Sequence, residues 1–389
     1  MSFHPHAHLL PAALDDLPRI VSACNDLLVD AAGHRLIDLF SANGAAFLGH
    51  AHPRIAQALK QQLDAVWLTG GLPTDAGDAA RQALEARLPS GLRLAGLYTT
   101  GMEAAEFAMR MARVHTGRPS FVGFDRSMHG KSLATAALGW ANAPAVPMVH
   151  RLPSFADQPP ARVLQQLEDC LRRHPVAAVF LEPVLGSGGG HVAPEGWFAE
   201  LIVLCHSHGA LVVADEILCG VHRTGPFLAH APMRADCAGP DLLLLGKGLG
   251  NGFPVAAVAA RADIACTAAM LPGSTYAGNP LSARAVAATL AELPAVDVPA
   301  RVAAITEAVQ GALAGVEGVV LRGRGALWMI EVASAQRAQS LARRLYRQGV
   351  FVSCTAQYLR VLPAATITPA HLAQALGVLR EALCAPVQD

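Results

Sequence analysis

The chain has 389 residues, of which 52% are hydrophobic and 15% are charged. Its 30 basic and 30 acidic residues cancel, so no charge excess attracts nucleic acid or an anionic membrane. The length favours two domains, and the large apolar share predicts an extensive buried interface with a second subunit.

The cysteines favour a reducing compartment. None of the eight has CxxC spacing, and the chain is too long to be a disulfide scaffold. The N-terminal segment has no basic stretch followed by an apolar one, which predicts no signal peptide. No charge-free run reaches the length of a membrane span. We therefore expect a cytoplasmic protein.

Two groups of residues are compatible with metal binding, but each has a simpler interpretation. One lies near a chain end and the other in the polar last turn of a helix, where such residues are common. The group near the chain end is His4, His6 and His8, and the group in the helix turn is Cys205, His206 and His208. We expect no metal at either group.

The first predicted elements are a hairpin over residues 26–40, with Gly33 at its turn, and helices at about 53–67 and 76–88. Short apolar strands then alternate with helices such as 103–116 and 161–173. The strands are expected at 96–100, 120–124, 146–150, 177–182, 210–214, 242–246 and 255–260. This alternation predicts an α/β fold with a mainly parallel seven-stranded sheet, in which ligands bind beyond the carboxyl ends of the strands.

The C-terminal third predicts a smaller α+β domain joined by the N-terminal hairpin. Its helices are expected from 280 to about 293 and at 299–315, 334–348 and 369–384, and its strands near 318–333 and at 350–353 and 358–362. We therefore divide the chain into residues 1–50 and 286–389 for the small domain and 51–285 for the large domain.

Lys247 is the most informative residue. It follows the apolar run 242–245 and stands between two glycines, where burial lowers an amine pKa and makes the amine nucleophilic. About thirty residues upstream, the apolar run 211–214 ends in Asp215. A lysine and an acid at neighbouring strand ends suit pyridoxal phosphate: the lysine forms a Schiff base and the acid keeps the ring nitrogen protonated. Taken alone, each residue could instead be a surface lysine or a helix cap.

Further residues fit the same site. The turn Thr99–Gly101 follows a strand and opens a helix, where free N–H groups can bind phosphate. His129 lies on the turn after strand 120–124, where it can line a cofactor face. Thr275, in a Gly- and Asn-rich loop, offers a hydroxyl, and Arg360 suits a substrate carboxylate. Thr99–Gly101 alone could be a simple helix cap, and Arg360 alone a surface charge.

Taken together, these motifs resemble the class III aminotransferases of PLP fold type I over nearly the whole chain. This group includes the acetylornithine, ornithine and 4-aminobutyrate aminotransferases and dialkylglycine decarboxylase. The segments that carry the resemblance are LGHAHP (48–53), TTGMEAAEFAMRMA (99–112), SMHGKS (127–132), EPVLGSGGG (182–190), GALVVADEILCGVHRTG (209–225), PDLLLLGKGLGNGFPVAAV (240–258), STYAGNP (274–280), RGRGALW (322–328) and LRVLP (359–363).

The resemblance implies a role for each residue. Lys247 would be the Schiff-base lysine, Asp215 the ring-nitrogen partner and the run 100–102 the phosphate turn. Thr275 would contact the phosphate of the neighbouring subunit's cofactor, which implies a homodimer with shared sites. Arg360 would hold the α-carboxylate of the substrate.

Four positions depart from the family pattern. Met128 stands where an aromatic ring usually covers the cofactor, and Met102 where a threonine usually binds phosphate. Leu218 replaces a glutamine that reaches the ring phenolate in many relatives. Ser187 replaces an acid that neutralises the carboxylate-binding arginine in ornithine-type enzymes, so we expect Arg360 to be free. These departures leave the cofactor interpretation intact and the substrate open.

We predict ping-pong transamination between an amino acid or amine donor and a keto acid or aldehyde acceptor. A decarboxylase, racemase or epimerase of the same fold is an alternative, because contacts from Asn43, Lys131 and Arg360 would decide which substrate bond breaks. The alternative from another class is a PLP-fold binding protein without turnover.

Overall fold

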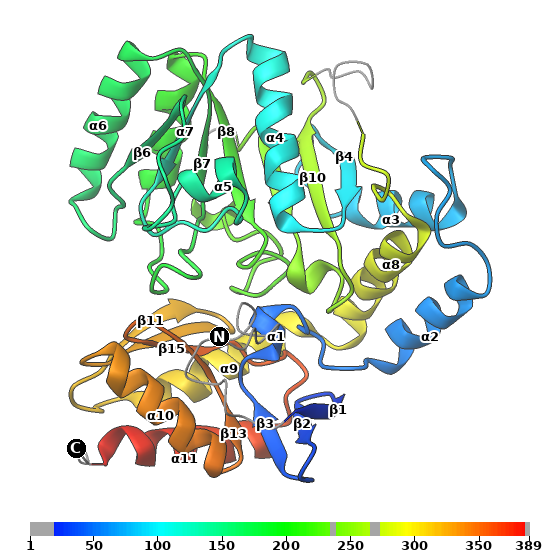
Figure 1. Ribbon diagram of the computed structural model, residues 1–389, viewed down its shortest axis with the longest axis vertical. Coiled ribbons are helices and arrows are strands. Elements are labelled where there is room, and N and C mark those ends of the chain that lie inside the picture. Colours follow the sequence, from blue (N-terminus) through cyan, green and yellow to red (C-terminus); the bar gives the residue numbers. More distant parts are fainter. Residues whose placement is uncertain (1–18, 234–238, 265–272, 386–389) are drawn as a thin grey trace, which may run out of the picture.

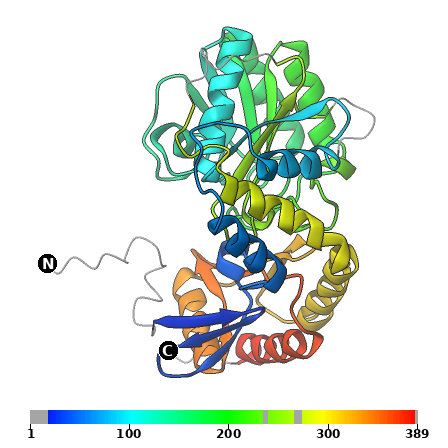
Figure 2. The same cartoon turned by 90° about the vertical axis from the view of Figure 1, so that its right-hand side faces the viewer.

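The computed structural model describes residues 19–233, 239–264 and 273–385. Figure 1 shows two parts, a larger one with a central sheet and a smaller one built from both ends of the chain, and helix α8 (Pro280–Ala295) runs between them. Figure 2 shows the same two parts from the side. The histidines at positions 4, 6 and 8 lie outside the described residues.

The large sheet has seven strands in the order β4-β10-β9-β8-β7-β5-β6. The pairs among β9, β8, β7, β5 and β6 are parallel, while β10 is antiparallel to both of its neighbours. The strands are β4 (Leu92–Tyr98), β5 (Ser120–Phe124), β6 (Val149–Leu152), β7 (Val176–Leu181), β8 (Leu211–Glu216), β9 (Leu242–Leu245) and β10 (Ala256–Arg261). The predicted fold class and mainly parallel sheet are confirmed.

The central strands are apolar because both faces of the sheet are covered. Along β9, Leu242 and Leu244 pack into a core with α4, whereas Leu243 and Leu245 pack into a second core on the opposite face. The helices around the sheet are α3 (Asp75–Glu85), α4 (Gly101–Thr116), α5 (Leu133–Ala137), α6 (Pro160–Arg173) and α7 (Trp197–Ser207).

The smaller part contains two four-stranded sheets, β1-β2-β3-β13 and β11-β12-β15-β14. The parallel pair of β13 with β3 ties the C-terminal segment to the N-terminal hairpin, as predicted. Its strands are β1 (Ile20–Cys24), β2 (Leu27–Asp30), β3 (Arg35–Asp38), β11 (Val320–Arg324), β12 (Leu327–Glu331), β13 (Val350–Phe351), β14 (Ser353–Thr355) and β15 (Tyr358–Val361). Its helices are α9 (Val298–Leu313), α10 (Ala335–Arg347) and α11 (Pro369–Cys384).

Two elements differ locally from the sequence predictions. The strand expected at 146–150 begins at Val149, because Pro147 lacks an N–H and Met148 has a left-handed φ of 67°. The helix predicted at about 53–67 is α2 (Pro53–Leu63), which ends four residues earlier than predicted. None of the described helices combines the length and apolarity that a membrane crossing needs.

Candidate active site

Polar residues gather where the parallel strands β7, β8 and β9 end. Glu182 directly follows β7, Asp215 is the penultimate residue of β8, and Lys247 begins a 3-10 turn, η3 (Lys247–Leu249), after β9. Because these strands are parallel neighbours, their carboxyl ends meet at one edge of the sheet, next to the N-terminus of α4 (Figure 1).

A cavity of about 320 Å³ opens at this edge. Its lining includes six of the residues predicted from the sequence, namely Thr100, Gly101, Met102, Met128, His129 and Lys247. The remaining walls come from Ala45, Thr99, Gly130, Ile217 and the run 252–255.

Lys247 is held in a strained and poorly solvated position. Its φ is 43°, in the left-handed region that a lysine rarely adopts, and such strain is often found at functional sites. Burial lowers the pKa of the Lys247 amine, although the nearby Asp215 and Glu182 oppose this shift. A depressed pKa makes the neutral, nucleophilic amine more available.

Asp215 and His129 form a buried pair. The His129 Nδ1 lies 2.8 Å from the Asp215 Oδ2, and the Ile217 N–H donates to the Oδ1 at 3.1 Å. The ring of His129 also packs edge-on against Phe180, with centroids 5.7 Å apart. These contacts fix the Asp215 carboxylate in one orientation beneath the cavity.

The adjacent Glu216 faces the interior and has a different environment. Its carboxylate accepts hydrogen bonds from the Ala229 N–H at 2.6 Å and the His230 N–H at 2.9 Å, and contacts the His230 Nδ1 at 2.5 Å. Glu216 is therefore a structural residue of the large domain, whereas Asp215 pairs with His129, which lines the cavity.

The N-terminus of α4 presents free donors to the cavity. Thr100 caps the helix, its hydroxyl accepting from the Glu103 N–H at 3.1 Å, and Glu103 reaches back to the Thr99 N–H at 2.9 Å. Gly101 and Met102 lie in the first turn, where an α-helix offers no internal acceptor for their N–H groups. These two N–H groups and the helix dipole suit an anion.

Arg360 and Asn43, both predicted as substrate residues, are brought together. The Arg360 Nη1 donates to the Asn43 Oδ1 at 2.8 Å, and the guanidinium lies over the Phe40 ring at 5.3 Å. Burial lowers the pKa of Arg360 to about 10, while Glu182 opposes the shift. Within the described residues no carboxylate forms an ion pair with Arg360, and its buried Nε has no hydrogen-bond partner.

Asn43 stands on an unusual turn, α1 (Ser41–Gly44). Residues 41–44 all have positive φ, from 43° at Ser41 to 80° at Gly44. Left-handed backbone costs roughly 1–2 kcal/mol for an ordinary residue, so surrounding contacts must hold this turn in place.

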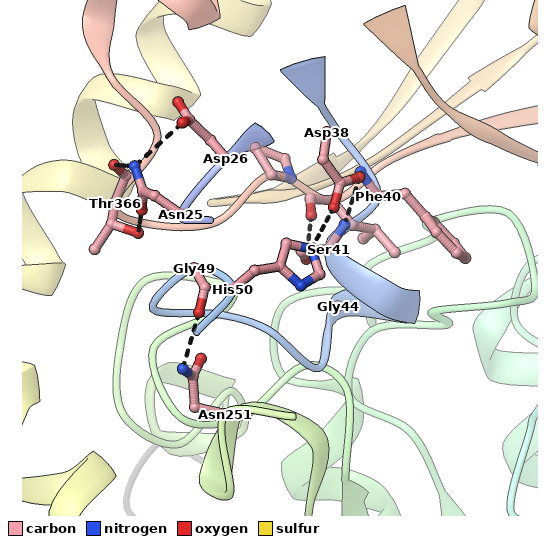
Figure 3. A network of polar contacts seen from close by, with 12 residues as sticks. Asn25, Asp26, Asp38, Phe40, Ser41, Gly44, Gly49, His50, Asn251 and Thr366 are labelled. Carbon is pink, nitrogen blue, oxygen red and sulfur yellow. Dashed lines mark hydrogen bonds and ion pairs between the residues drawn. The ribbon is translucent and has the colours of Figure 1, made fainter. Parts of the chain in front are cut away.

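Figure 3 shows the polar contacts that hold it. The Asp38 carboxylate accepts from the N–H groups of Phe40 at 2.8 Å and Ser41 at 3.0 Å, and contacts the His50 Nε2 at 2.7 Å. Asn251, which follows the turn that carries Lys247, donates to the Gly49 carbonyl at 3.1 Å. The segment that carries Asn43 is thus joined to the segment that carries Lys247.

Six of the predicted residues are not part of the cavity lining. Three of them, Asp215, Asn43 and Arg360, are described above. Leu218 is buried and packs against Gly44 and Gly186, where a Cβ would come within 2.8 Å and 2.4 Å of its methyl groups. Lys131 is exposed, with its ammonium 5.4 Å from the centre of the Trp140 ring. Thr275 is exposed in the single chain.

Among the residues of the site that the sequence did not identify, Glu182 and Ile217 lie next to Asp215. Glu182 is 5% exposed and accepts from the Met128 N–H at 2.7 Å and the Gly186 N–H at 3.1 Å. Burial and the neighbouring Asp215 raise the pKa of Glu182 to about 7. Ile217 lines the cavity two residues after Asp215. The sequence could have identified Glu182, because it follows an apolar strand in the same way as Asp215 does.

Comparisons with known proteins agree with this geometry. The model of the family "Aminotransferase class-III" matches residues 15–383. The chain is 33% identical to the acetylornithine aminotransferase of Methanopyrus kandleri, covering 91% of each chain, and 28% identical to the 4-aminobutyrate aminotransferase of Mycobacterium bovis, covering 95% of this chain and 91% of the relative.

The fold is also that of a solved transaminase from the marine bacterium Virgibacillus. The two structures superpose with a TM-score of 0.87 at 21% identity, over 94% of this chain and 92% of the other. The family match covers nearly the whole chain, and the chain therefore belongs to the class-III aminotransferases.

Proposed function

We propose that this aminotransferase binds pyridoxal 5′-phosphate in the cavity described above, with Lys247 as the covalent attachment point. The observation that carries the proposal is the convergence of Lys247, the Asp215–His129 pair and the N-terminus of α4 on one cavity. When bound, the cofactor supplies an electron sink for the negative charge that develops at the substrate carbon.

The residues present fit the cofactor. A Cβ on Gly101 would lie 2.6 Å from the Ile217 Cδ1, so glycine keeps the helix terminus close to the cavity wall. The N–H groups of Gly101 and Met102 would hold the phosphate, and Asp215 would keep a proton on the ring nitrogen. Met128 and Ile217 supply apolar walls that exclude water.

Lys247 would have two tasks, attachment of the cofactor and proton transfer. Its lowered pKa favours the neutral amine, which can take a proton from the substrate carbon and return it to the cofactor side. Leu218 would act indirectly, by filling the space between Gly44 and Gly186 behind the site.

We propose that Arg360, oriented by Asn43, binds the α-carboxylate of an amino acid substrate. Support comes from its buried Nε, which lacks a partner, and from the absence of a neutralising ion pair within the described residues. Of the substrates in the relatives' names, acetylornithine carries an α-carboxylate, and 4-aminobutyrate carries a carboxylate at the far end from its amine. Lys131 remains a proposed contact for a more distal substrate group.

We further propose a cytoplasmic homodimer in which Thr275 reaches the partner's cofactor phosphate. Large apolar side chains are exposed on that loop and on the segment that precedes α3: Tyr276 is 59%, Leu72 is 70% and Trp67 is 60% exposed. Leu72 and Ala277 line the same surface depression, so the two apolar segments are adjacent and suit a second subunit. The six cysteines within the described residues are free, which supports a reducing compartment.

We also keep the division into residues 1–50, 51–285 and 286–389 as a proposal. The hairpin and the two small sheets support it, while the second boundary falls inside the continuous helix α8.

A panel of amino donors with keto acid acceptors tests the proposed reaction. Formation of the keto product from the donor, with an equal amount of new amine on the acceptor, is expected for the wild type and absent in Lys247→Ala. Sedimentation of the same samples should show a dimer. Release of CO2 or racemisation of the donor without amino transfer would contradict transamination.

A further inference from the structure

A second cluster of reactive side chains lies at the opposite end of the large sheet. His150 lies on the edge strand β6, Cys170 on α6, and His174 directly after α6. Within the residues that the structure describes, these form a single group of three or more His, Cys, Asp or Glu side chains spaced for metal binding, with ligand atoms within 4.8 Å of one another.

The position of the cluster separates it from the active site. His174 precedes β7 at its amino end, whereas Glu182 follows β7 at its carboxyl end. At about 3.3 Å of rise per residue, the two positions are on the order of 20 Å apart. The cofactor chemistry therefore makes no use of this cluster.

The local structure presents the side chains to one another. Cys170 and His174 are four residues apart around the end of α6, where one helix turn aligns side chains. Cys170 lies on the buried face of the helix with Val163 and Leu167, and α6 packs against β6. The rings of His150 and His174 stack with centroids 4.0 Å apart.

An orphaned polar atom points to a missing ligand. The His150 Nε2 is buried and has no hydrogen-bond partner within the described structure, which is costly for an imidazole nitrogen. Burial and the neighbouring His174 lower the pKa of His150, which favours the neutral ring that binds metals. Burial raises the pKa of the Cys170 thiol, which the cationic Arg173 opposes, so a bound cation would have to displace the thiol proton. The Arg173 guanidinium itself lies 3.7 Å from Asp169.

We propose that His150, Cys170 and His174 form a binding site for Zn²⁺ or another thiophilic divalent cation. Two imidazoles and one thiolate are soft to borderline ligands that select zinc over magnesium or calcium. Ligand atoms in a tetrahedral zinc site are roughly 3.5 Å apart. The stacked rings of His150 and His174 must turn out of their parallel arrangement before a nitrogen of each points at the same ion. His174 is exposed, which leaves the fourth position to water.

Binding would release the thiol proton of Cys170 to solvent and would join α6 to strand β6. Among the described strands β6 pairs only with β5, so it is an edge strand whose other side lacks a partner strand. A metal at this place would therefore stabilise the edge of the sheet.

Equilibrium dialysis of the metal-stripped holoenzyme against Zn²⁺ in excess Mg²⁺ tests the proposal. We expect one tightly bound zinc per chain in a background where His4, His6 and His8 are alanine, which removes the N-terminal histidines as competing ligands. Cys170→Ser and His174→Ala should each weaken binding at least about tenfold. Cys24→Ser, which changes an exposed free cysteine away from the cluster, should have no effect.

Cobalt substitution gives a second measurement that does not depend on affinity. The difference spectrum between Co²⁺-loaded and metal-free holoenzyme should show a thiolate-to-cobalt charge-transfer band, which Cys170→Ser abolishes. His174 is exposed, so loss of the tetrahedral cobalt bands in His174→Ala cannot be ascribed to misfolding. Zinc binding that survives both variants, or cobalt without a thiolate band, would overturn the proposal.

Discussion

Two buried arginines lie between the large and small parts of the molecule, and their surroundings differ. Arg223 is 1% exposed, and its Nη1 donates to the carbonyls of Ala326 at 3.1 Å and Pro363 at 2.6 Å. Its Nη2 donates to the Gly44 carbonyl at 2.9 Å. Arg360 is 8% exposed, but among the residues that the structure describes it donates only to Asn43, and its buried Nε has no partner there.

This difference separates structure from function. A guanidinium has five N–H donors, and burial without partners is costly. Arg223 uses its donors to join the N-terminal turn to the β11–β12 hairpin and the end of β15. Arg360 still has N–H donors available. A substrate carboxylate has the planar geometry that could accept from two of them.

The largest effect is expected at Arg223. Arg223→Met leaves three buried carbonyls without donors and should lower the free energy of unfolding by about 3–5 kcal/mol. The ratio of KM values for amino acids and simple amines should be unchanged. Urea unfolding and steady-state kinetics provide the two readouts, and a selective loss of carboxylate substrates would remove the distinction between the two arginines.

A somewhat smaller effect is expected at Arg360, on substrate binding and not on folding. Arg360→Ala removes a charge-assisted bond worth about 2–4 kcal/mol, which corresponds to a KM rise of roughly 30- to 1000-fold for α-amino acids. Simple amines should be almost unaffected. If both substrate types lose activity equally, Arg360 is structural like Arg223.

Glu182 is the acid whose charge acts on Arg360. Its own titration predicts that the stability of the protein depends on pH. The pKa of Glu182 is raised to about 7 in the folded protein, so between about pH 4.5 and 7 the folded state holds more protons than the unfolded chain. Its contribution to stability therefore falls as pH rises through this window.

Glu182→Gln removes that titration. The stability of cofactor-free wild type relative to Glu182→Gln should fall by about 1–3 kcal/mol between pH 4.5 and 7.5. A glutamine cannot accept from both Met128 and Gly186, but that cost is independent of pH. A constant difference in unfolding free energy across this range would show that Glu182 is ionised throughout.

The smallest effect is expected on the turn that orients Arg360 through Asn43. Ala42 is exposed and has a φ of 52°, so Ala42→Gly relieves left-handed strain without loss of packing. We expect a gain of up to about 1 kcal/mol in unfolding free energy. A destabilised Ala42→Gly variant would mean that this turn stores no strain.

The sequence was sufficient for the sheet and for the part of the cavity lining that lies on the α4 turn, at Met128–His129 and at Lys247. The Leu242–Leu245 run is a fully buried strand, and Lys247 lies at its end because parallel strands must direct their termini to one edge. The choice of Asp215 over Glu216 as the site residue was less well determined. Adjacent residues on a strand face opposite sides, but the sequence pattern does not say which side holds the cavity.

Features that depend on distant contacts could not be predicted. The left-handed turn at residues 41–44 is held from far along the chain, because the Ser41 hydroxyl donates to the Leu362 carbonyl and Arg223 donates to the Gly44 carbonyl. Its local sequence has no glycine before position 44. The cluster of His150, Cys170 and His174 forms because α6 packs on β6. No motif of fixed spacing in the sequence predicts it.

Reduction of the holoenzyme with borohydride, followed by peptide mapping by mass spectrometry, tests the central claim most directly. Reduction fixes the cofactor to whichever lysine holds it. We predict one adduct per chain, on the peptide that contains Lys247, and none in Lys247→Ala. An adduct on another lysine, or none in an active wild-type enzyme, would contradict the assignment of the cavity at the ends of β8 and β9 as the cofactor site.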